Sequence, residues 1–279
     1  GNSVVPLING DEAFPAMLSA IDAARQSIAL QSYIFDADPV GELFGAALAR
    51  AAARGVAVRI LIDDVGSRYS RPTMIRVLQQ HGLEAAAFLP TQVPRLFRYA
   101  NLRNHRKIMV VDGRVGFMGG LNLRCGHWLA RKPRRPVRCV HFQVEGPAVA
   151  DLQRVFAADW TFTTGELLEG ATWFPPLEPC GTVNARGIAD GPDEDLGKMP
   201  DVLLGALAAA RRSVHIITPY FLPDDVLLRA LQVTSLRGVE VKIVLPGRSN
   251  VPIIDWAMQP QLPYLLDRGC RIFLSPLPF

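Results

Sequence analysis

Apolar and polar positions in the first ninety residues follow two different periods in turn, which predicts alternating strands and helices. Short apolar runs bounded by polar residues indicate buried strands, at residues 27–35, 56–62 and 83–89. Segments with apolar side chains at helical spacing indicate helices, at residues 11–24, 41–54 and 74–80. Gly55 and Gly82 follow the last two helices, where a helix C-terminus favours glycine. This alternation favours an α/β layered domain.

A similar order of residues returns in the second half of the chain. Residues 20–28 resemble 206–214, residues 54–60 resemble 237–243, and residues 78–82 resemble 265–269, at offsets of 186, 183 and 187. Three blocks in the same order at nearly one offset predict a duplicated α/β unit. We expect a first domain over residues 1–165, a connection rich in Gly, Pro and acidic residues over 166–200, and a second domain over 201–279.

The segment over residues 105–112 is apolar and β-branched, and Asp112 with Gly113 forms a two-residue turn signal before another short apolar run. This pattern predicts two antiparallel strands joined by a tight turn. Because successive side chains of a strand alternate between its faces, we expect His105 and Lys107 on one face and Asp112 on the other.

An imidazole beside a fixed ammonium suits chemistry on a phosphate ester. The cation offsets the charge of the phosphate oxygens while the imidazole attacks phosphorus. Gly119 and Gly120 follow the second strand and would let backbone N–H groups approach an anion, with the side-chain amide of Asn122 as a further donor. The plainer alternative is an ordinary hairpin with a surface histidine and lysine.

Composition limits the class of protein. Hydrophobic residues make up 49% and charged residues 20% of the 279 residues, which predicts a well-packed core. The longest runs without Asp, Glu, Lys or Arg have eleven residues, at 213–223 and 256–266, and are too short to cross a bilayer. We therefore expect a protein that is soluble or lies on a membrane surface. The four cysteines form no C-x-x-C pair, so we expect free thiols and no zinc site.

The positive charge is concentrated in one part of the chain. Residues 91–138 contain twelve Lys or Arg and one acidic residue, a net charge of +11, while the whole chain carries +4. A basic segment around the His105 strand favours a polyanionic partner, either anionic lipid or nucleic acid. For residues 131–135 taken alone, a solvated basic loop is the simpler interpretation.

The spacing His-x-Lys, four residues, Asp, six residues, Gly-Gly-x-Asn resembles the signature of the phospholipase D superfamily. Within that superfamily the chain is similar to the bacterial cardiolipin synthases. The segments that carry this resemblance are Ser-Tyr-Ile-Phe at 32–35, Val-Glu-Gly-Pro at 144–147, Asp-Trp at 159–160, Thr-Gly at 164–165 and Thr-Pro-Tyr-Phe at 218–221.

The resemblance implies two α/β/α sandwich domains related by a pseudo-two-fold axis, the second copy being incomplete here. It implies a phosphatidyltransferase that makes cardiolipin from phosphatidylglycerol through a phosphohistidine, without metal or other cofactor. It also implies a cytoplasmic enzyme bound peripherally to the inner face of the bacterial membrane. A phospholipase D-type hydrolase, a nucleic-acid phosphodiesterase and an inactive module that binds anionic surfaces are the alternatives; nucleic acid is the less favoured partner.

Carried onto this chain, the resemblance makes His105 the nucleophile or the general acid. Lys107 and Asn122 become ligands of phosphate oxygens, Gly120 allows close backbone approach, and Asp112 orients the motif.

The chain departs from the family pattern in two places. It contains His-x-Lys once, and we expect a second copy shortly after residue 279, or a homodimer that pairs two copies of His105. Cys139 stands six residues before Glu145, where the family often has Asp, which puts transferase activity in question.

Overall fold

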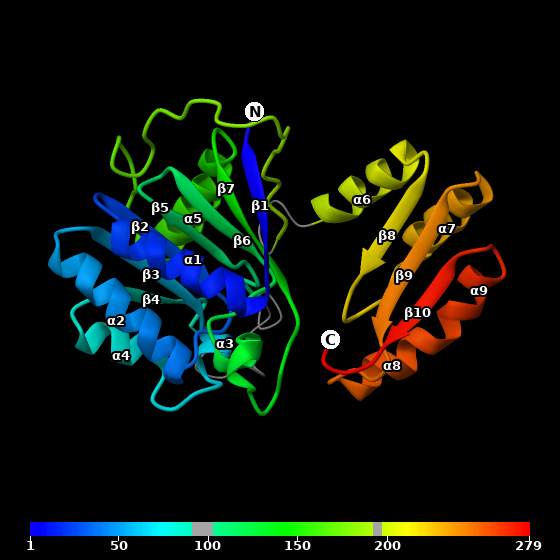
Figure 1. The fold of residues 1–279 in the computed structure, drawn as a ribbon, viewed down its shortest axis with the longest axis horizontal. Coiled ribbons are helices and arrows are strands. Elements are labelled where there is room, and N and C mark those ends of the chain that lie inside the picture. Colours follow the sequence, from blue (N-terminus) through cyan, green and yellow to red (C-terminus); the bar gives the residue numbers. More distant parts are fainter. Residues whose placement is uncertain (91–102, 192–196) are drawn as a thin grey trace. The chain divides into compact units, whose positions relative to one another are not determined.

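The computed structural model describes residues 1–90, 103–191 and 197–279. The chain divides into two compact units, Gly1–Pro192 and Asp193–Phe279, whose elements are labelled in Figure 1. The stretch of the basic segment between residues 91 and 102 lies outside the described residues.

The first unit is built on a seven-stranded mixed sheet with the order β1-β7-β6-β5-β2-β3-β4. The strands are β1 (Ser3–Ile8), β2 (Ser27–Ser32), β3 (Ala57–Asp63), β4 (Glu84–Phe88), β5 (Ile108–Val111), β6 (Val115–Gly119) and β7 (Val140–Glu145). Strands β2, β3 and β4 are parallel. The pairs β2–β5, β5–β6, β6–β7 and β7–β1 are antiparallel. The parallel strands are joined by helices, as parallel connections require.

Helices cover both faces of this sheet (Figure 1). They are α1 (Asn9–Ala23), α2 (Pro39–Ala53), the single turn α3 (Asp64–Ser67), α4 (Met74–Gln80) and α5 (Val149–Thr164). Two short 3₁₀ turns, η1 (Cys125–His127) and η2 (Leu129–Arg131), follow β6. Helices α1, α2 and α4 bury Phe14, Phe44 and Leu78 against one face of the sheet. Helix α5 buries Phe156 and Trp160 against the other, which gives a three-layer α/β/α unit.

The turn between β5 and β6 shows how local sequence fixes the hairpin. Asp112 and Gly113 have φ of 52° and 61°, and the Arg114 N–H donates to Val111 O at 2.9 Å. Positive φ at both central residues is the geometry that Asp-Gly favours in a two-residue turn. A Cβ on Gly113 would come within 2.3 Å of Pro175 Cδ, so this position also needs glycine for space.

Residues 166–191 lie with the first unit, although their composition predicted a connection. Leu168 and Trp173 are buried in the cluster formed by α5, and Asn2 pairs with Val183 in an isolated antiparallel bridge. The predicted division at residues 165 and 200 stays a prediction.

The second unit has a three-stranded parallel sheet in the order β10-β9-β8. Its elements are α6 (Lys198–Ala209), β8 (Ser213–Ile217), α7 (Asp225–Leu236), β9 (Glu240–Pro246), α8 (Pro252–Met258), η3 (Gln259–Gln261), α9 (Leu262–Leu266) and β10 (Arg271–Ser275). Leu231, Val241 and Ile243 form the centre of a separate core. This order of helices and parallel strands repeats that of α1, β2, α2, β3, α4 and β4. Duplication of the unit remains an inference from the sequence.

The predicted α/β class is confirmed by this architecture and by the structural likeness given below. Within the described residues, no helix has both the length and the apolar content that a bilayer span needs.

Candidate active site

His105 and Lys107 lie on the approach to β5, at the edge of the sheet where β2 and β3 end. The predicted strand from residue 105 was too long, since β5 begins at Ile108. The physical reason is local: the Arg106 N–H donates to the side-chain oxygen of Asn104 at 3.1 Å, so it does not extend the ladder with β2. Side chains nevertheless alternate between faces across this segment.

The His105 and Lys107 side chains meet. Lys107 Nζ lies 3.4 Å from His105 Nδ1 and donates to the His105 carbonyl oxygen at 2.8 Å. The Tyr33 ring, which follows β2, lies 4.5 Å from the imidazole between centroids, and Lys107 Nζ is 5.5 Å from the Tyr33 centroid. Lys107 is 6% exposed, whereas His105 is exposed. The predicted imidazole–ammonium pair is therefore present, with the imidazole nearer to solvent.

The electrostatics of this pair favour a neutral imidazole. Although His105 as a residue is exposed, desolvation of its ring by neighbouring groups, and secondarily the charge of Lys107, lowers its pKa to about 4. Burial lowers the pKa of Lys107 to about 8, although nearby Cys139 and Asp63 act in the opposite direction. At neutral pH His105 keeps a free lone pair and Lys107 remains mostly charged, which is the state that nucleophilic attack on an anionic ester needs.

Asn122 follows β6 and is tied to the segment after β2. Its Oδ1 accepts from the Ile34 N–H at 3.2 Å, next to Tyr33, whose ring contacts His105. Within the described part of the chain no group accepts a hydrogen bond from Asn122 Nδ2. That amide can therefore donate to a ligand.

The glycines before Asn122 serve close packing. Gly119 has φ of 153°, and a Cβ there would lie 2.7 Å from His141 Nδ1. The Gly120 N–H donates to Val140 O at 3.3 Å, and a Cβ would lie 2.9 Å from Cys139 Sγ. Because this amide is engaged within the sheet, phosphate binding by Gly120 stays a prediction.

Asp112 lies at the opposite end of β5 from His105. Its carboxylate accepts from the backbone N–H groups of Arg25, Gln26 and Ser27 at 2.7 to 3.1 Å, where β2 begins. The structure thus places Asp112 away from the His105–Lys107 pair, in a position to fix the start of β2.

Two buried histidines, His127 and His141, are close enough to Lys107 to be affected by its charge. His127 is 3% and His141 2% exposed, and burial lowers the pKa of each to about 4. Smaller effects come from the charges of Arg124 and Lys107 at His127 and of Lys107 at His141. A cavity of about 10 Å³ is lined by Lys107, His141 and Gln31, among others. Neither histidine belongs to a sequence motif.

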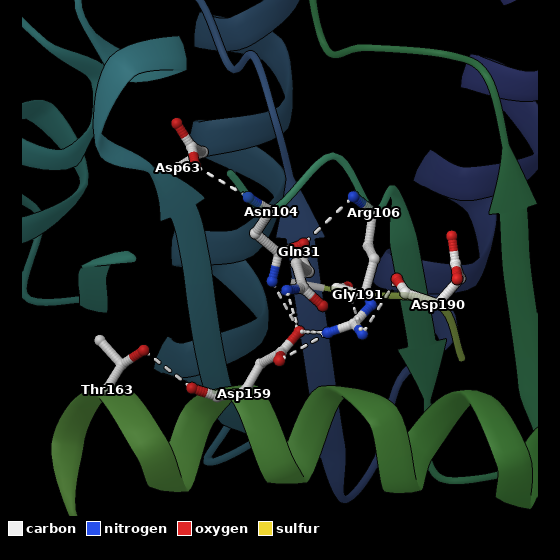
Figure 2. Close-up of polar contacts among 8 residues, drawn as sticks. All are labelled: Gln31, Asp63, Asn104, Arg106, Asp159, Thr163, Asp190 and Gly191. Carbon is white, nitrogen blue, oxygen red and sulfur yellow. Dashed lines mark hydrogen bonds and ion pairs between the residues drawn. The ribbon is translucent and has the colours of Figure 1, made fainter. Parts of the chain in front are cut away.

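A network around Asp159 was not predicted from the sequence (Figure 2). Asp159 lies on the buried face of α5, and its Oδ2 accepts from Gln31 Nε2 and Asn104 Nδ2, both at 2.6 Å. Arg106 Nη1 donates to both carboxylate oxygens at 2.7 Å. The available signal was an acidic residue at a core position of the helix, three residues after Phe156 and before Trp160.

The segment that begins at the last residue of η2 and leads into Cys139 presents positive charge at the surface. We define the basic loop as residues 131–138, in which Arg131, Lys132, Arg134, Arg135 and Arg138 are exposed. Within the described residues none of these five side chains forms an ion pair with a carboxylate. The loop is anchored just before it begins, because the Asp11 carboxylate accepts from the Leu129 and Ala130 N–H groups at 3.0 and 2.7 Å.

A family model described as cardiolipin synthase, PLD-like domain, matches residues 17–160 and 203–278. Among curated proteins, a cardiolipin synthase 1 of Bacillus anthracis is 36% identical over 96% of this chain. A cardiolipin synthase of Staphylococcus aureus is 33% identical over 95%. Each alignment covers 54% of the relative, so the chain spans about half the length of the curated relatives it matches.

A likeness of fold is also found among solved structures. The phosphatidylserine synthase of Haemophilus influenzae matches 88% of this chain, and 61% of its own, with a TM-score of 0.62 at 13% identity.

Proposed function

The chain belongs to the cardiolipin synthase family with phospholipase D-like domains, and we propose that it carries a phosphatidyl-transfer centre that makes cardiolipin from phosphatidylglycerol. The contact between His105 and Lys107 is the observation that carries this proposal. It supplies a nucleophile and a fixed cation at one exposed edge of the sheet.

In the first step His105 Nε2 attacks the phosphorus of phosphatidylglycerol. As the N–P bond forms, the P–O bond to the glycerol headgroup breaks, and its electron pair leaves with the glycerol oxygen. For this the ring proton has to be on Nδ1, whose neighbour in the structure is the Lys107 ammonium. A bound phosphate draws this ammonium to its own oxygens, which frees Nδ1 to carry the proton.

The phosphate oxygens are held by Lys107 and Asn122. The ammonium offsets their negative charge in a site where Lys107 is largely shielded from water, so the attraction is stronger than at an open surface. The free Nδ2 amide of Asn122 donates a further hydrogen bond. Close approach at Gly120 and orientation of the motif by Asp112 complete the assignment.

Transfer needs a second acid–base group. It protonates the leaving glycerol oxygen and later removes the proton from the hydroxyl of a second phosphatidylglycerol, as that hydroxyl attacks phosphorus and the N–P bond breaks. The family resemblance gives this role to the histidine of a second His-x-Lys motif. In a homodimer, His105 of a second copy would serve.

The basic loop suits a membrane surface that presents anionic phospholipid. Its five exposed cations attract such a surface, and each contributes on the order of 1 kcal/mol near the headgroups. Binding at the inner face of the bacterial membrane would deliver phosphatidylglycerol to His105.

A phosphodiester with a p-nitrophenyl leaving group tests the first step, because this phenolate leaves without a proton. We expect one acid-labile phosphoryl adduct per chain, located at His105 by mass spectrometry. The adduct should be absent in His105→Asn and retained in His81→Gln, which changes an exposed histidine outside the site. A wild-type chain that forms no adduct would contradict the proposal.

Labelled phosphatidylglycerol vesicles separate the remaining functions. Transfer yields cardiolipin and glycerol, whereas hydrolysis yields phosphatidic acid. Nicking of DNA or RNA at low salt would instead favour a nucleic-acid phosphodiesterase. Vesicle binding without an adduct at His105 would favour an inactive binding module.

A further inference from the structure

His105 lies between two residues that bind the same carboxylate. Asn104 donates to Asp159 through its side-chain amide, and Arg106 donates through its guanidinium (Figure 2). His105 lies on the other side of the chain from Asp159, because side chains alternate along this extended segment. Fixing the residues before and after His105 to one face therefore directs the imidazole to the opposite face, where Lys107 and Tyr33 lie.

The contacts of Asn104 and Arg106 with the Asp159 carboxylate, which we call the clamp, are buried and involve charged groups. The side chains of Asp159 and Arg106 are 6% and 13% exposed, and Asn104 as a residue is 2% exposed. Hydrogen bonds to an ionised group are shorter and stronger than neutral ones, and low exposure strengthens them further. The guanidinium is also held on its other side, since Arg106 Nη2 donates to the Gly191 carbonyl oxygen at 2.8 Å.

The backbone of Asn104 is also fixed by a second element, β3. The Asn104 N–H donates to Asp63 Oδ2 at 3.0 Å, and Asp63 is the buried last residue of β3. Gln31, on β2, donates to the same Asp159 oxygen as Asn104. Residues 104 and 106 are thus held by β3 and α5 together, while β2 holds the carboxylate of Asp159.

We infer that Asp159 is a positioning residue that sets the orientation of the His105 imidazole through Asn104 and Arg106. Its effect on the reaction rests on the proposed function, but its effect on the imidazole does not. Without this carboxylate the segment loses its common anchor on α5. His105 then moves away from Lys107 and Tyr33 into water.

The pKa of His105, followed by NMR at its Cε1 proton, tests the inference without any turnover. It should lie near 4 in the wild-type chain and rise by about 1 or more in Asp159→Asn, because both causes of the depression weaken. Loss of the negative charge of Asp159 would by itself lower this pKa, so a rise reports repositioning. A folded Asp159→Asn chain with an unchanged or lower His105 pKa would overturn the inference.

The control variant is Asp22→Asn. It removes one carboxylate from an exposed ion pair with Arg50 and should leave the His105 pKa unchanged. Should Asp159→Asn fail to fold, Asn104→Ala decides the question, because it keeps the Arg106–Asp159 ion pair and removes one link. The same direction with a smaller rise is expected, and an unchanged pKa in folded Asn104→Ala overturns the inference.

A kinetic readout links the clamp to the reaction. With phosphatidylglycerol vesicles, Asp159→Asn should lower kcat at least tenfold and change KM less than twofold, because the imidazole is misaligned while the phosphate ligands remain. Unchanged kcat in a folded variant would contradict the inference. If the wild-type chain shows neither turnover nor the adduct at His105 with the p-nitrophenyl phosphodiester, the proposed function fails, and the NMR comparison still decides the role of Asp159.

Discussion

The Lys107 ammonium lies 3.4 Å from His105 Nδ1 and donates a hydrogen bond to the His105 carbonyl oxygen at 2.8 Å. The backbone of His105 therefore holds the Lys107 ammonium beside the His105 side chain. Binding of a phosphate can draw the ammonium away from the ring while this backbone link limits how far it moves.

Lys107→Met should raise the pKa of His105 above its wild-type value of about 4. The loss of a neighbouring positive charge favours the protonated imidazole. The pKa should remain below 6.5, because burial is the larger cause of the depression. Titration of the Cε1 proton by NMR measures the change, and Lys107→Arg, which keeps the charge, is the matched control. A lower pKa in Lys107→Met would contradict this prediction.

Asn122→Asp should weaken binding of inorganic phosphate by roughly tenfold or more, since a carboxylate replaces an amide donor and repels the anion. The substitution is nearly isosteric and keeps an oxygen to accept from the Ile34 N–H, so the fold should be retained. Chemical-shift changes at His105 during a phosphate titration report the affinity. Equal affinity for phosphate in the wild-type and variant chains would show that Asn122 is not a phosphate ligand.

Mild acid should destabilise the first unit through His127 and His141. Both have a folded-state pKa of about 4, below the ordinary 6.5. Between these values the unfolded chain binds protons that the folded chain excludes, so the free energy of unfolding falls as the pH drops from 6.5 to 4. Each histidine can contribute up to about 3 kcal/mol.

Urea unfolding at pH 7, 6 and 5 measures this dependence, and His141→Gln should make it shallower. Burial raises the pKa of Asp36 and Asp63, which acts in the opposite direction at the acidic end because the folded state then gains protons. If the free energy of unfolding of His141→Gln depends on pH as in the wild-type chain, His141 does not contribute to the acid destabilisation.

Replacing Arg131, Lys132, Arg134 and Arg135 by Gln should weaken binding to phosphatidylglycerol vesicles by roughly two to three orders of magnitude at low salt, at about 1 kcal/mol per charge. Co-sedimentation measures the binding, and vesicles of phosphatidylcholine give the uncharged reference. The control is Arg50→Gln with Arg154→Gln, exposed arginines that each pair with a carboxylate. The control removes two charges and the loop variant four, so a loss in the control half as large on a logarithmic scale would mean that net charge, and not this loop, governs binding.

Local features of this fold could be predicted from the sequence, and contacts between distant elements could not. The helix predicted over 74–80 is α4 (Met74–Gln80), and the Asp112-Gly113 hairpin forms, because spacing and turn chemistry are properties of neighbouring residues. The start of β5 was misplaced because a side chain, Asn104 Oδ1, takes the Arg106 N–H.

The same distinction between local features and distant contacts applies to the candidate site. Alternation along an extended chain was enough to bring His105 and Lys107 together. Asp159 meets Arg106 across 53 residues, and no local spacing specifies such a contact. Trp173 is likewise buried among residues far from it in the chain, which the composition of residues 166–191 does not specify.

The Asp112 carboxylate is occupied by three backbone amides at the start of β2. A descendant of this chain that had lost all catalysis would still need that acid to assemble its sheet. The aspartate of the signature therefore reports on the scaffold, and its presence alone does not indicate catalysis, which under the proposed function depends on His105, Lys107 and Asn122.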